Sequence, residues 1–436
     1  MKYLAALLLL LSLSIHLSAQ KARLYAGPVV GSVTTTSARI WIGYSGKGKN
    51  AVVLGDTSSK QVIYPSNYSY LAEKGIVSLT FEFTRLQPGH SYNVLVSIEG
   101  WKTNVKTTFR TQDSVPVRDF AFNTGSCALL CTDWMRPVFP GAKSNIFTTM
   151  KKHPADFMLW LGDNIYYLTS KDYKSMDAMF MHNIRVRRSF RQLKTFLSST
   201  PHYAIWDDHD YGPNDADGTW ALKDSALMIF KSFWPNTYPE QKQFNGNYFS
   251  FRYYDTEFFM TDDRYFRDAP GDSAAHFLGE TQMVWLKNKL QLSDAAFKFI
   301  CIGTQVLNDN KFGETYKQYP KERQDLFDFI IKNNIKGVVF LTGDKHYSEI
   351  CKKNVDGYPM YDFTCSPLTS PVLPRRLFGA YSNATRIPGT DLSRHNYGRI
   401  SVTGPVGDRT CIIEIHGRYG QKRRELRIPQ SELQRK

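Results

Sequence analysis

The segment DFMLWLGDN, residues 156–164, combines a short apolar run with a polar end. A short apolar run bounded by turn residues is typical of a buried strand, and here Gly162 allows the backbone to turn before Asp163. Three further apolar runs also end in polar residues that can bind metals: AFNTGSC (121–127), HYAIWDDHD (202–210) and GVVFLTGDKH (337–346). Four such strands could bring oxygen, nitrogen and sulfur donors to one edge of a sheet. The pattern therefore predicts a metal centre, and hydrolysis at that centre is the first interpretation.

Asp163 and the aspartate-rich segment 206–210 carry the strongest part of this prediction. One carboxylate can bridge two cations through its two oxygens, although an aspartate at this point could also cap the following segment. In segment 206–210, Asp208 and His209 stand among carboxylates that repel one another unless cations or basic partners intervene. Trp206 indicates partial burial, and the burial of like charges without compensation is costly. We therefore favour metal binding over a plain aspartate-rich turn.

Asp344 and His346 stand two residues apart after an apolar run, so in an extended or turned segment they share a face and could reach one ion. Cys127 could supply a thiolate, which would indicate a transition metal rather than a group-2 ion. Tyr166, three residues after the first aspartate, could join it as a phenolate on a ferric ion. A disulfide to Cys131 or a buried thiol explains Cys127 slightly better by spacing alone, and a packed aromatic side chain does the same for Tyr166.

The N-terminal residues predict export. Residues 1–19 combine a basic start, a short apolar centre and a small-residue exit, which are typical of a secretory signal peptide. The apolar stretch is shorter than the ~20 residues of a membrane-spanning helix, and no later segment qualifies. We therefore expect a periplasmic or secreted protein without a transmembrane segment.

The rest of the chain divides into two folded parts. Residues 24–111 contain short alternating runs separated by turn residues, which predict a small β-sandwich of the fibronectin III or immunoglobulin kind. Tyr92 follows a Pro-Gly turn, as in a tyrosine corner. Residues 112–119 are the predicted linker, and residues 120–436 alternate strands with helical patterns, which indicates an α/β fold. The helical and hairpin segments expected there are 145–153, 175–199, 280–293 and 321–334 as helices, and 247–267 as an antiparallel pair.

Six cysteines and a formal net charge of +15 bear on compartment and partners. An even number of cysteines in an oxidising compartment allows disulfides, and Cys351 with Cys365, which flank one predicted hairpin, is the best pair. Cys301 lies inside an apolar run and is expected to be a buried free thiol. The positive charge would attract phosphate esters, nucleic acid or acidic lipids, although general solubility explains scattered basic residues equally well.

Four ordered segments resemble the sequence blocks of one family: TGSC (124–127), LGDNIY (161–166), IWDDHD (205–210) and LTGDKHYSE (341–349). The chain resembles the PhoD-type alkaline phosphatases and phosphodiesterases of the metallophosphatase superfamily. The similarity covers residues 120 to about 370, and the N-terminal β-domain is also similar to the leading domain of that family. The resemblance implies a four-layer α/β/β/α core and a ferric ion bridged to calcium or another divalent ion.

Carried over by position, the resemblance assigns Cys127, Asp163 and Tyr166 to the iron, with Asp163 bridging. It assigns the second metal to three other residues, namely Asp208, Asp344 and His346. Asn214 is similar to an asparagine near a further calcium at the substrate. Arg188 matches an arginine of the substrate site, and two neighbouring arginines, Arg187 and Arg191, compete with it.

The implied activity is that of an exported metal-dependent phosphoesterase that hydrolyses phosphate monoesters or diesters by in-line attack of a metal-bound hydroxide. Arg188 would neutralise charge on the phosphate oxygens. His209 would protonate the leaving alkoxide or serve as a third metal ligand. Asp263 and Arg264 are similar to a further family block but are equally well explained by an internal salt bridge, and His395 and Asn396 could line the pocket mouth or make a turn.

Two alternatives remain open. One is a phosphodiesterase specialised for teichoic acid, phospholipid or nucleic acid, in which nucleic acid is a substrate only. The other, from a different class, is a non-catalytic surface adhesin whose β-sandwich and basic charge bind anionic polymers. In either enzyme we expect a monomer that acts on a small or polymeric phosphate ester.

Overall fold

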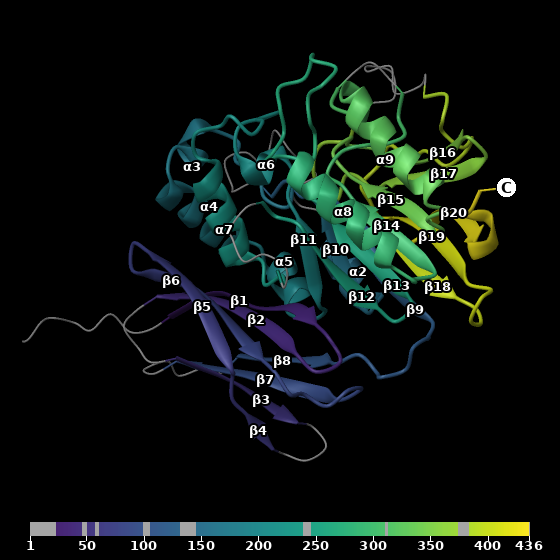
Figure 1. Cartoon of the computed structure of the whole chain (residues 1–436). Coiled ribbons are helices and arrows are strands. Elements are labelled where there is room, and N and C mark those ends of the chain that lie inside the picture. The colour runs from purple at the N-terminus through teal and green to yellow at the C-terminus, as the bar shows by residue number, and fades with distance from the viewer. Residues whose placement is uncertain are drawn as a thin grey trace, which may run out of the picture.

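The computed structural model describes residues 23–45, 50–56, 61–98, 105–130, 145–238, 246–309, 313–373 and 383–435 (Figure 1). The predicted signal peptide and Cys131 lie outside these ranges. Within them, no helix has the length and apolar character needed to cross a membrane. The described residues form four β-sheets, two of four strands and two of six.

The two four-stranded sheets are antiparallel and come from the N-terminal residues. One has the order β1-β2-β6-β5 and the other β4-β3-β7-β8. Their bounds are β1 Arg23–Val33, β2 Ala38–Ser45, β3 Asn50–Asp56, β4 Val62–Ile63, β5 Asn67–Glu73, β6 Ile76–Phe83, β7 Ser91–Ile98 and β8 Val105–Arg110. The predicted tyrosine corner is confirmed, because the Tyr92 hydroxyl accepts a hydrogen bond from the backbone N–H of Gln87 at 2.8 Å.

The two six-stranded sheets contain all four apolar runs that the sequence singled out. The first sheet has the order β11-β10-β9-β18-β19-β20 and the second β12-β13-β14-β15-β17-β16. The bounds are β9 Phe120–Gly125, β10 Phe157–Leu161, β11 His202–Ile205, β12 Phe249–Tyr253, β13 Thr256–Met260, β14 Phe297–Cys301, β15 Val338–Thr342, β16 Glu349–Val355, β17 Tyr358–Thr364, β18 Asn396–Thr403, β19 Thr410–Gly417 and β20 Lys422–Pro429. Because β9, β10 and β11 are parallel, their carboxyl ends meet at one edge. β15 is likewise parallel to its neighbours β14 and β17 in the second sheet.

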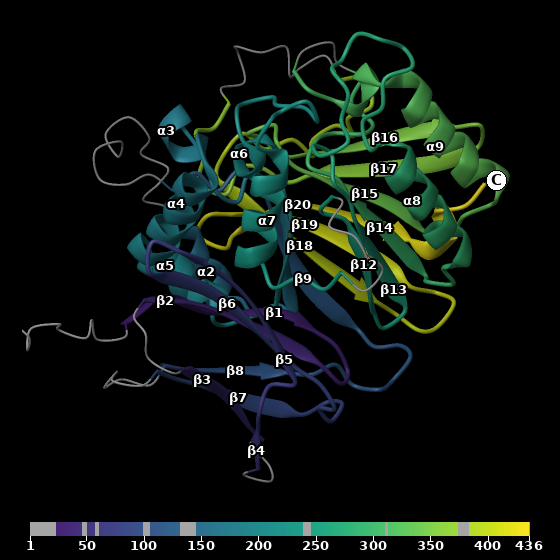
Figure 2. The same cartoon turned by 60° about the vertical axis from the view of Figure 1, so that its left-hand side comes forward.

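Helices connect and cover these strands (Figures 1 and 2). Their bounds are α2 Ile146–Lys152, α3 Ser170–Tyr173, α4 Met176–Ser189, α5 Arg191–Leu197, α6 Asp208–Tyr211, α7 Lys223–Phe233, α8 Glu280–Leu292 and α9 Pro320–Lys332, with 3₁₀ turns at Tyr316–Gln318 and Gln430–Glu432. The long helix expected over 175–199 is two helices, because Phe190 adopts an extended backbone with φ −111° and ψ 99°. The other three predicted helices and the predicted pair β12–β13 are confirmed.

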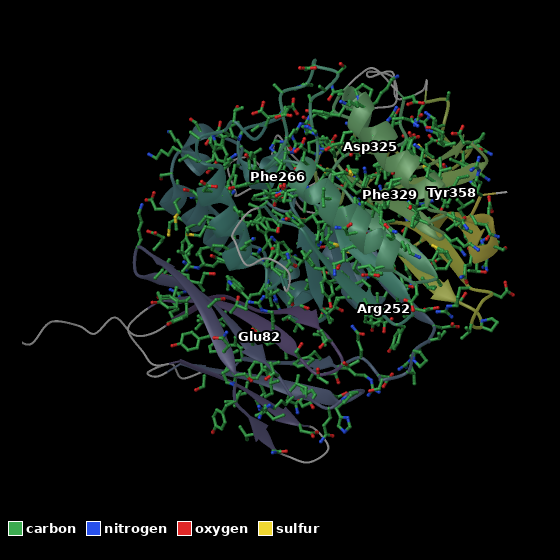
Figure 3. The ribbon with its side chains drawn as sticks, viewed as in Figure 1. Glu82, Arg252, Phe266, Asp325, Phe329 and Tyr358 are labelled. Atoms are coloured by element: carbon green, nitrogen blue, oxygen red, sulfur yellow. The ribbon has the colours of Figure 1, made fainter. Side chains whose placement is uncertain are left out.

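The apolar core is divided between the faces of the sheets. In β10, Met158 and Trp160 pack with α2, α4, α5 and α7, whereas Leu159 and Leu161 pack against side chains of the second six-stranded sheet. This follows from the period of two in a strand, which sends alternate side chains to opposite faces. A further cluster joins the second sheet to α8 and α9. Lys287 of α8 forms an ion pair with Asp325 of α9, and its ammonium lies 5.5 Å from the ring centre of Phe329 on the same helix. Figure 3 labels these two residues of α9.

The predicted disulfide between Cys351 and Cys365 is wrong, since both thiols are free and buried. Cys351 on β16 lies opposite Asp362 of β17, while Cys365 follows the end of β17, three residues further along that strand. An odd offset along the strand puts the two side chains on opposite faces. Accordingly, Cys351 belongs to the cluster shared with α8 and α9, and Cys365 to the cluster shared with the first six-stranded sheet. Cys301 is a buried free thiol, as predicted.

Candidate metal centre

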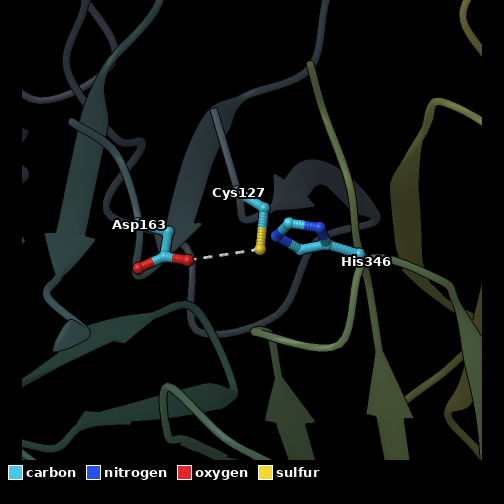
Figure 4. Close-up of side chains that lie close together, drawn as sticks. All are labelled: Cys127, Asp163 and His346. Atoms are coloured by element: carbon cyan, nitrogen blue, oxygen red, sulfur yellow. Dashed lines mark hydrogen bonds between the residues drawn. The ribbon is translucent and has the colours of Figure 1, made fainter. Parts of the chain in front are cut away.

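Four of the predicted ligands lie in the turns that follow β9, β10 and β15. Cys127 follows β9, Asp163 and Tyr166 follow β10, and His346 follows β15. Cys127, Asp163 and His346 form a first group in which one donor atom of each residue lies within 4.8 Å of the others (Figure 4). Cys127 Sγ lies 3.5 Å from Asp163 Oδ2. The Tyr166 hydroxyl joins the group, because it donates to Asp163 Oδ2 at 2.8 Å and lies 3.3 Å from His346 Nε2.

Two further groups extend the first. One consists of Asp163, Asp208 and His209, and the other of Asp208, Asp215 and Glu314. Each group therefore shares one carboxylate with the next. The His209 backbone N–H donates to Asp163 Oδ1 at 3.3 Å, and the Asp215 backbone N–H donates to Asp208 Oδ2 at 2.8 Å. A shared carboxylate can bridge two cations, so the row of groups can hold more than one ion.

The backbone at these residues is unusual. Ten non-glycine residues of the described ranges have positive φ, and five of them belong to the groups or to the loop after β15: Cys127 (56°), Asp163 (55°), Asp215 (57°), Asp344 (69°) and His346 (55°). A non-glycine residue in this left-handed region costs of order 1 kcal/mol and persists only where its surroundings enforce it. Such residues are known to gather at functional sites. Strained turns thus aim the donor atoms inward.

Close approach of the two six-stranded sheets assembles the site from separate strands. A Cβ on Gly343, which follows β15, would lie 2.5 Å from the carbonyl oxygen of Leu161 and 2.7 Å from the side chain of Ser126. Only glycine allows the turn after β15 to come this close to the ends of β9 and β10. The sheets therefore meet at the candidate ligands.

Burial makes the donors of the first group hard to ionise without a cation. Burial, together with the nearby Asp344, raises the pKa of the Cys127 thiol to about 12. Burial raises the pKa of Asp163 well above its usual value, and the charges of Asp208 and Cys127 add to the effect. The pKa of Tyr166 is also raised, by burial and by Asp163. A cation placed among these groups would favour their charged forms.

The donor set fits a metal cofactor. Thiolate and imidazole donors suit a transition metal, while the carboxylates suit a harder divalent cation. The buried atoms His209 Nδ1 and Asp207 Oδ2 and both carboxylate oxygens of Asp263 have no hydrogen-bond partner among the described residues. Arg264 compensates part of the charge of Asp207 and Asp263, and a cation would stabilise the further carboxylates buried beside them, Asp163 and Asp208. The site therefore supports a divalent metal cofactor.

Asp210 positions the loop after β10 instead of pointing toward the groups. Its carboxylate accepts hydrogen bonds from the backbone N–H groups of Asn164 at 3.0 Å, Ile165 at 2.9 Å and Asp207 at 3.2 Å. Burial nevertheless raises the pKa of Asp210 to about 7. Asp210 thereby fixes the turn that carries Asp163.

Arg264 forms an internal salt bridge, which was one of the two interpretations of this residue from the sequence. Its guanidinium is fully buried and pairs with Asp207 at the start of α6 and with Glu314. Burial acts to raise the pKa of Asp208, but the charges of Arg264 and His209 and the Asp215 backbone N–H outweigh it, and the pKa is lowered. Arg264 therefore lowers the pKa of Asp208, whereas burial still raises the pKa of its other neighbours, Asp207 and Asp263.

Three predicted residues are not brought into these groups. The Asp344 carboxylate accepts hydrogen bonds from Thr304 at 3.0 Å and from Lys345. Among the described residues Asp344 belongs to none of the three groups, and its grouping with Asp208 and His346 around one ion stays a prediction. The backbone oxygen of Asp344 still contacts the Cys127 thiol at 3.3 Å.

The other two are Asn214 and Arg188. Asn214 is exposed, and its neighbour Asp215 takes the place in the third group. Arg188 is exposed near the end of α4, with its guanidinium carbon 4.8 Å from the ring centre of Tyr25 on β1, and it belongs to none of the groups. The competing Arg187 is buried, with its guanidinium carbon 4.5 Å from the ring centre of Trp234. The structure thus gives neither arginine a contact with the candidate ligands.

Neither Asp215 nor Glu314 stands in a sequence pattern that indicates a metal ligand. Asp215 stands in the run PNDADG, one residue after Asn214, which the resemblance had indicated. Glu314 stands alone in a loop after β14. The feature that marks Glu314 is its ion pair with the buried Arg264, which is visible only in the folded structure.

Comparisons with known proteins agree with this geometry. A family model described as PhoD-like phosphatase matches residues 126–403. Alkaline phosphatase D of Bacillus subtilis (strain 168) is 26% identical over 258 residues, which cover 48% of this chain and 44% of that protein, so the match spans less than half of the relative.

Two solved structures share the fold. A structure of PhoD aligns with a TM-score of 0.70 and 17% identity over 90% of this chain and 91% of that chain. A purple acid phosphatase from yellow lupin (Lupinus luteus) seeds aligns with a TM-score of 0.68 and 12% identity over 94% of this chain and 74% of that chain. At these identities the likeness is one of fold.

Proposed function

Because the chain belongs to the PhoD-like phosphatase family, we propose that it is an exported metal-dependent phosphoesterase that hydrolyses phosphate monoesters or diesters. The observation that carries the proposal is the row of three ligand groups, which share Asp163 and Asp208 at the meeting edge of the two six-stranded sheets. A purely structural metal site would need only one closed group.

We assign Fe(III) to Cys127, Asp163, His346 and Tyr166, and calcium or another divalent ion to Asp163, Asp208 and His209. This differs from the set implied by the resemblance in placing His346 with Cys127 and in giving the second metal His209 instead of Asp344. Bound there, the two cations would neutralise phosphate charge and lower the pKa of a coordinated water. Thiolate and phenolate donors support the ferric assignment, since both prefer a transition metal over calcium.

His209 is the residue through which we propose that a proton reaches the leaving group. Its ring stacks on Tyr166 with centroids 4.2 Å apart, which fixes the orientation of the imidazole. The same nitrogen atoms could bind a cation. A His209→Gln variant separates the two roles, because loss of a ligand lowers metal content, whereas loss of an acid lowers kcat and leaves metal content unchanged.

We extend the proposal to the domain architecture of the chain and to its cellular compartment. We infer a four-layer α/β/β/α arrangement for residues 120–436, supported by the separate apolar clusters on the two faces of each six-stranded sheet. We also propose that residues 24–111 form a β-sandwich domain joined by residues 112–119, and that residues 1–19 direct export. N-terminal sequencing of protein recovered outside the cytoplasm tests the last point, and a start before residue 20 would contradict it.

The test of function is elemental analysis of the purified protein together with hydrolysis of p-nitrophenyl phosphate and bis(p-nitrophenyl) phosphate. We expect iron and a second metal, and a loss of at least about a thousandfold in kcat/KM, or about 4 kcal/mol, in Asp163→Ala. Asp344→Ala should also lose most turnover, because its backbone turn and carboxylate hold the loop that carries His346. Asp156→Ala, at the opposite end of β10, is the matched control and should remain active. Full activity in both of the first two variants would end the proposal.

A further inference from the structure

A basic pocket lies beside the candidate metal centre. It has a volume of about 380 Å³ and is lined by Arg394, His395, Arg418, Arg423 and neighbouring residues of β19 and β20 and the loops around them. The described residues that line it include no aspartate or glutamate. A concave surface with one sign of charge concentrates ions of the opposite sign.

The three arginines of this pocket have no ion-pair partner among the described residues. Arg418 donates a hydrogen bond to the Tyr419 hydroxyl at 2.6 Å, and no carboxylate pairs with Arg394 or Arg423. Arg427, four residues after Arg423 on the same strand, is instead paired with Glu425 at 2.8 Å. Guanidinium groups that are not neutralised by the protein itself are well suited to bind phosphate oxygens in pairs.

The pocket shares a wall with the first ligand group. His395, one of its lining residues, has Nε2 3.0 Å from the carbonyl oxygen of Ser370. Ser370 in turn donates its backbone N–H and its hydroxyl to the carbonyl oxygen of Cys127, at 3.0 and 2.8 Å. One residue therefore separates the pocket from the proposed iron ligand.

A second connection runs along the chain. Val372 lines the pocket, and the backbone N–H of the next residue, Leu373, donates to the carbonyl oxygen of His346 at 3.1 Å. The pocket thus adjoins the backbone of two candidate ligands, Cys127 and His346.

We propose that this pocket binds a second phosphate of the substrate, so that the preferred substrates are esters carrying at least two phosphate groups. The inference rests on the proposed phosphoesterase function and names its substrate class. One phosphate occupies the ligand groups while another is held by Arg394, Arg418 and Arg423. An ester with a single phosphate places no charged group in the pocket, so the pocket adds nothing to its binding free energy.

The test compares thymidine 5′-phosphate with thymidine 3′,5′-bisphosphate, which differ by one phosphate. In the metal-loaded Arg394→Ala/Arg423→Ala variant, we expect KM for the bisphosphate to rise by about tenfold, the equivalent of about 1.4 kcal/mol. KM and kcat for the monophosphate should remain within about twofold of the wild-type values, since charge in the pocket matters only to a second phosphate. Arg427→Ala, which removes a paired arginine of the same strand, is the matched control and should change neither substrate. An equal rise for both substrates, or no rise for either, would overturn the proposal.

Calorimetric titration of thymidine 3′,5′-bisphosphate separates failure of this inference from failure of the proposed function. If the wild-type protein hydrolyses neither the two thymidine esters nor the two p-nitrophenyl esters, the proposed function fails, and the titration still tests the pocket. About tenfold weaker binding in the double variant than in Arg427→Ala would then support a phosphate site. Equal binding in the two variants would refute it.

Discussion

At the scale of single residues, His202 gives the clearest dependence of stability on pH. His202 Nδ1 accepts a hydrogen bond from Trp160 Nε1 at 3.0 Å, and Nε2 lies 3.3 Å from the carbonyl oxygen of Phe196. Both nitrogens are thus engaged in the neutral form. Burial lowers the pKa of His202 to about 3 from its usual 6.5. Because the unfolded chain binds a proton below pH 6.5 and the folded chain does not, this contribution to stability is lost as the pH falls from about 6.5 towards 3.

We therefore expect a His202→Gln variant to lose less stability on acidification than the wild-type protein does. Between pH 7.5 and 4.5 the difference should be about 3 kcal/mol in the free energy of unfolding, measured by urea denaturation at the two values. His153→Gln, at an exposed histidine that ends α2, serves as the control and should follow the wild type. Parallel pH profiles for His202→Gln and the wild type would contradict the assignment.

Residue patterns predicted most of the candidate ligands but not their grouping. Asp163 and Asp208 could be found because each follows a strongly apolar strand, a signal that is local in sequence. For Cys127, spacing alone favoured a disulfide or a buried thiol, and only the family resemblance indicated a ligand. The partnership of His346 with Cys127 could not be found, since it depends on left-handed turns and on contact between two sheets. Glu314 shows the same limit, because its place is set by a buried ion pair with an arginine fifty residues away.

At the scale of elements, the order of strands explains why distant segments meet. Parallel strands with helical connections place their carboxyl ends at one edge of a sheet, which explains why the turns after β9 and β10 share a site. The expectation that all four apolar runs end at one edge of a single sheet was wrong, because β15 belongs to the other six-stranded sheet and its turn reaches the site through the close approach of the two sheets. The alternation of Met158 and Trp160 with Leu159 and Leu161 was hidden in a uniformly apolar run. A strand buried on both faces carries no period of two in its hydrophobicity, so its two packing partners could not be assigned from sequence.

The turn after β15 leads to a prediction about Gly343. Gly343→Ala adds a Cβ that meets the carbonyl oxygen of Leu161 at 2.5 Å, so the turn that carries Asp344 and His346 must move away from β10. We expect metal content to fall and kcat/KM to drop at least about tenfold, or about 1.4 kcal/mol. The free energy of unfolding should fall by about 1–3 kcal/mol.

The matched control is Gly55→Ala on β3, where no atom lies within 4 Å of the added Cβ. It should leave metal content, activity and stability near the wild-type values. Elemental analysis, steady-state kinetics and urea denaturation check both variants. A Gly343→Ala protein with full metal content and full activity would show that the close approach of the sheets does not position the ligands.

At the scale of the whole molecule, the N-terminal sheets pack on the larger part of the chain through β1 and β2. The Ser32 backbone N–H donates to the carbonyl oxygen of Pro235 at 3.1 Å, and the Val33 backbone N–H donates to the Tyr203 hydroxyl at 3.2 Å. Trp41 of β2 packs on Phe233 of α7 with ring centroids 5.4 Å apart. Sequence patterning predicted a β-sandwich with a linker, but this contact depends on surfaces that only folding creates.

The final prediction uses Gly31, the tightest point of that contact. A Cβ at Gly31 would lie 2.3 Å from Pro235 Cγ and 2.4 Å from its carbonyl oxygen, so Gly31→Ala must push β1 away from the segment after α7. Overpacking of this kind costs about 1–3 kcal/mol, and we expect a lower melting temperature by calorimetry. The kcat/KM should stay within about twofold of wild type, because the hydrogen bonds of β1 to the larger part of the chain, within the described residues, go to Pro235 and Tyr203 and not to a residue of the ligand groups. Gly55→Ala, also in the N-terminal sheets but in open space, should match the wild type in both measurements. If Gly31→Ala instead lost activity in proportion to stability, the N-terminal sheets would have to be regarded as part of the catalytic framework and not as a separately packed unit.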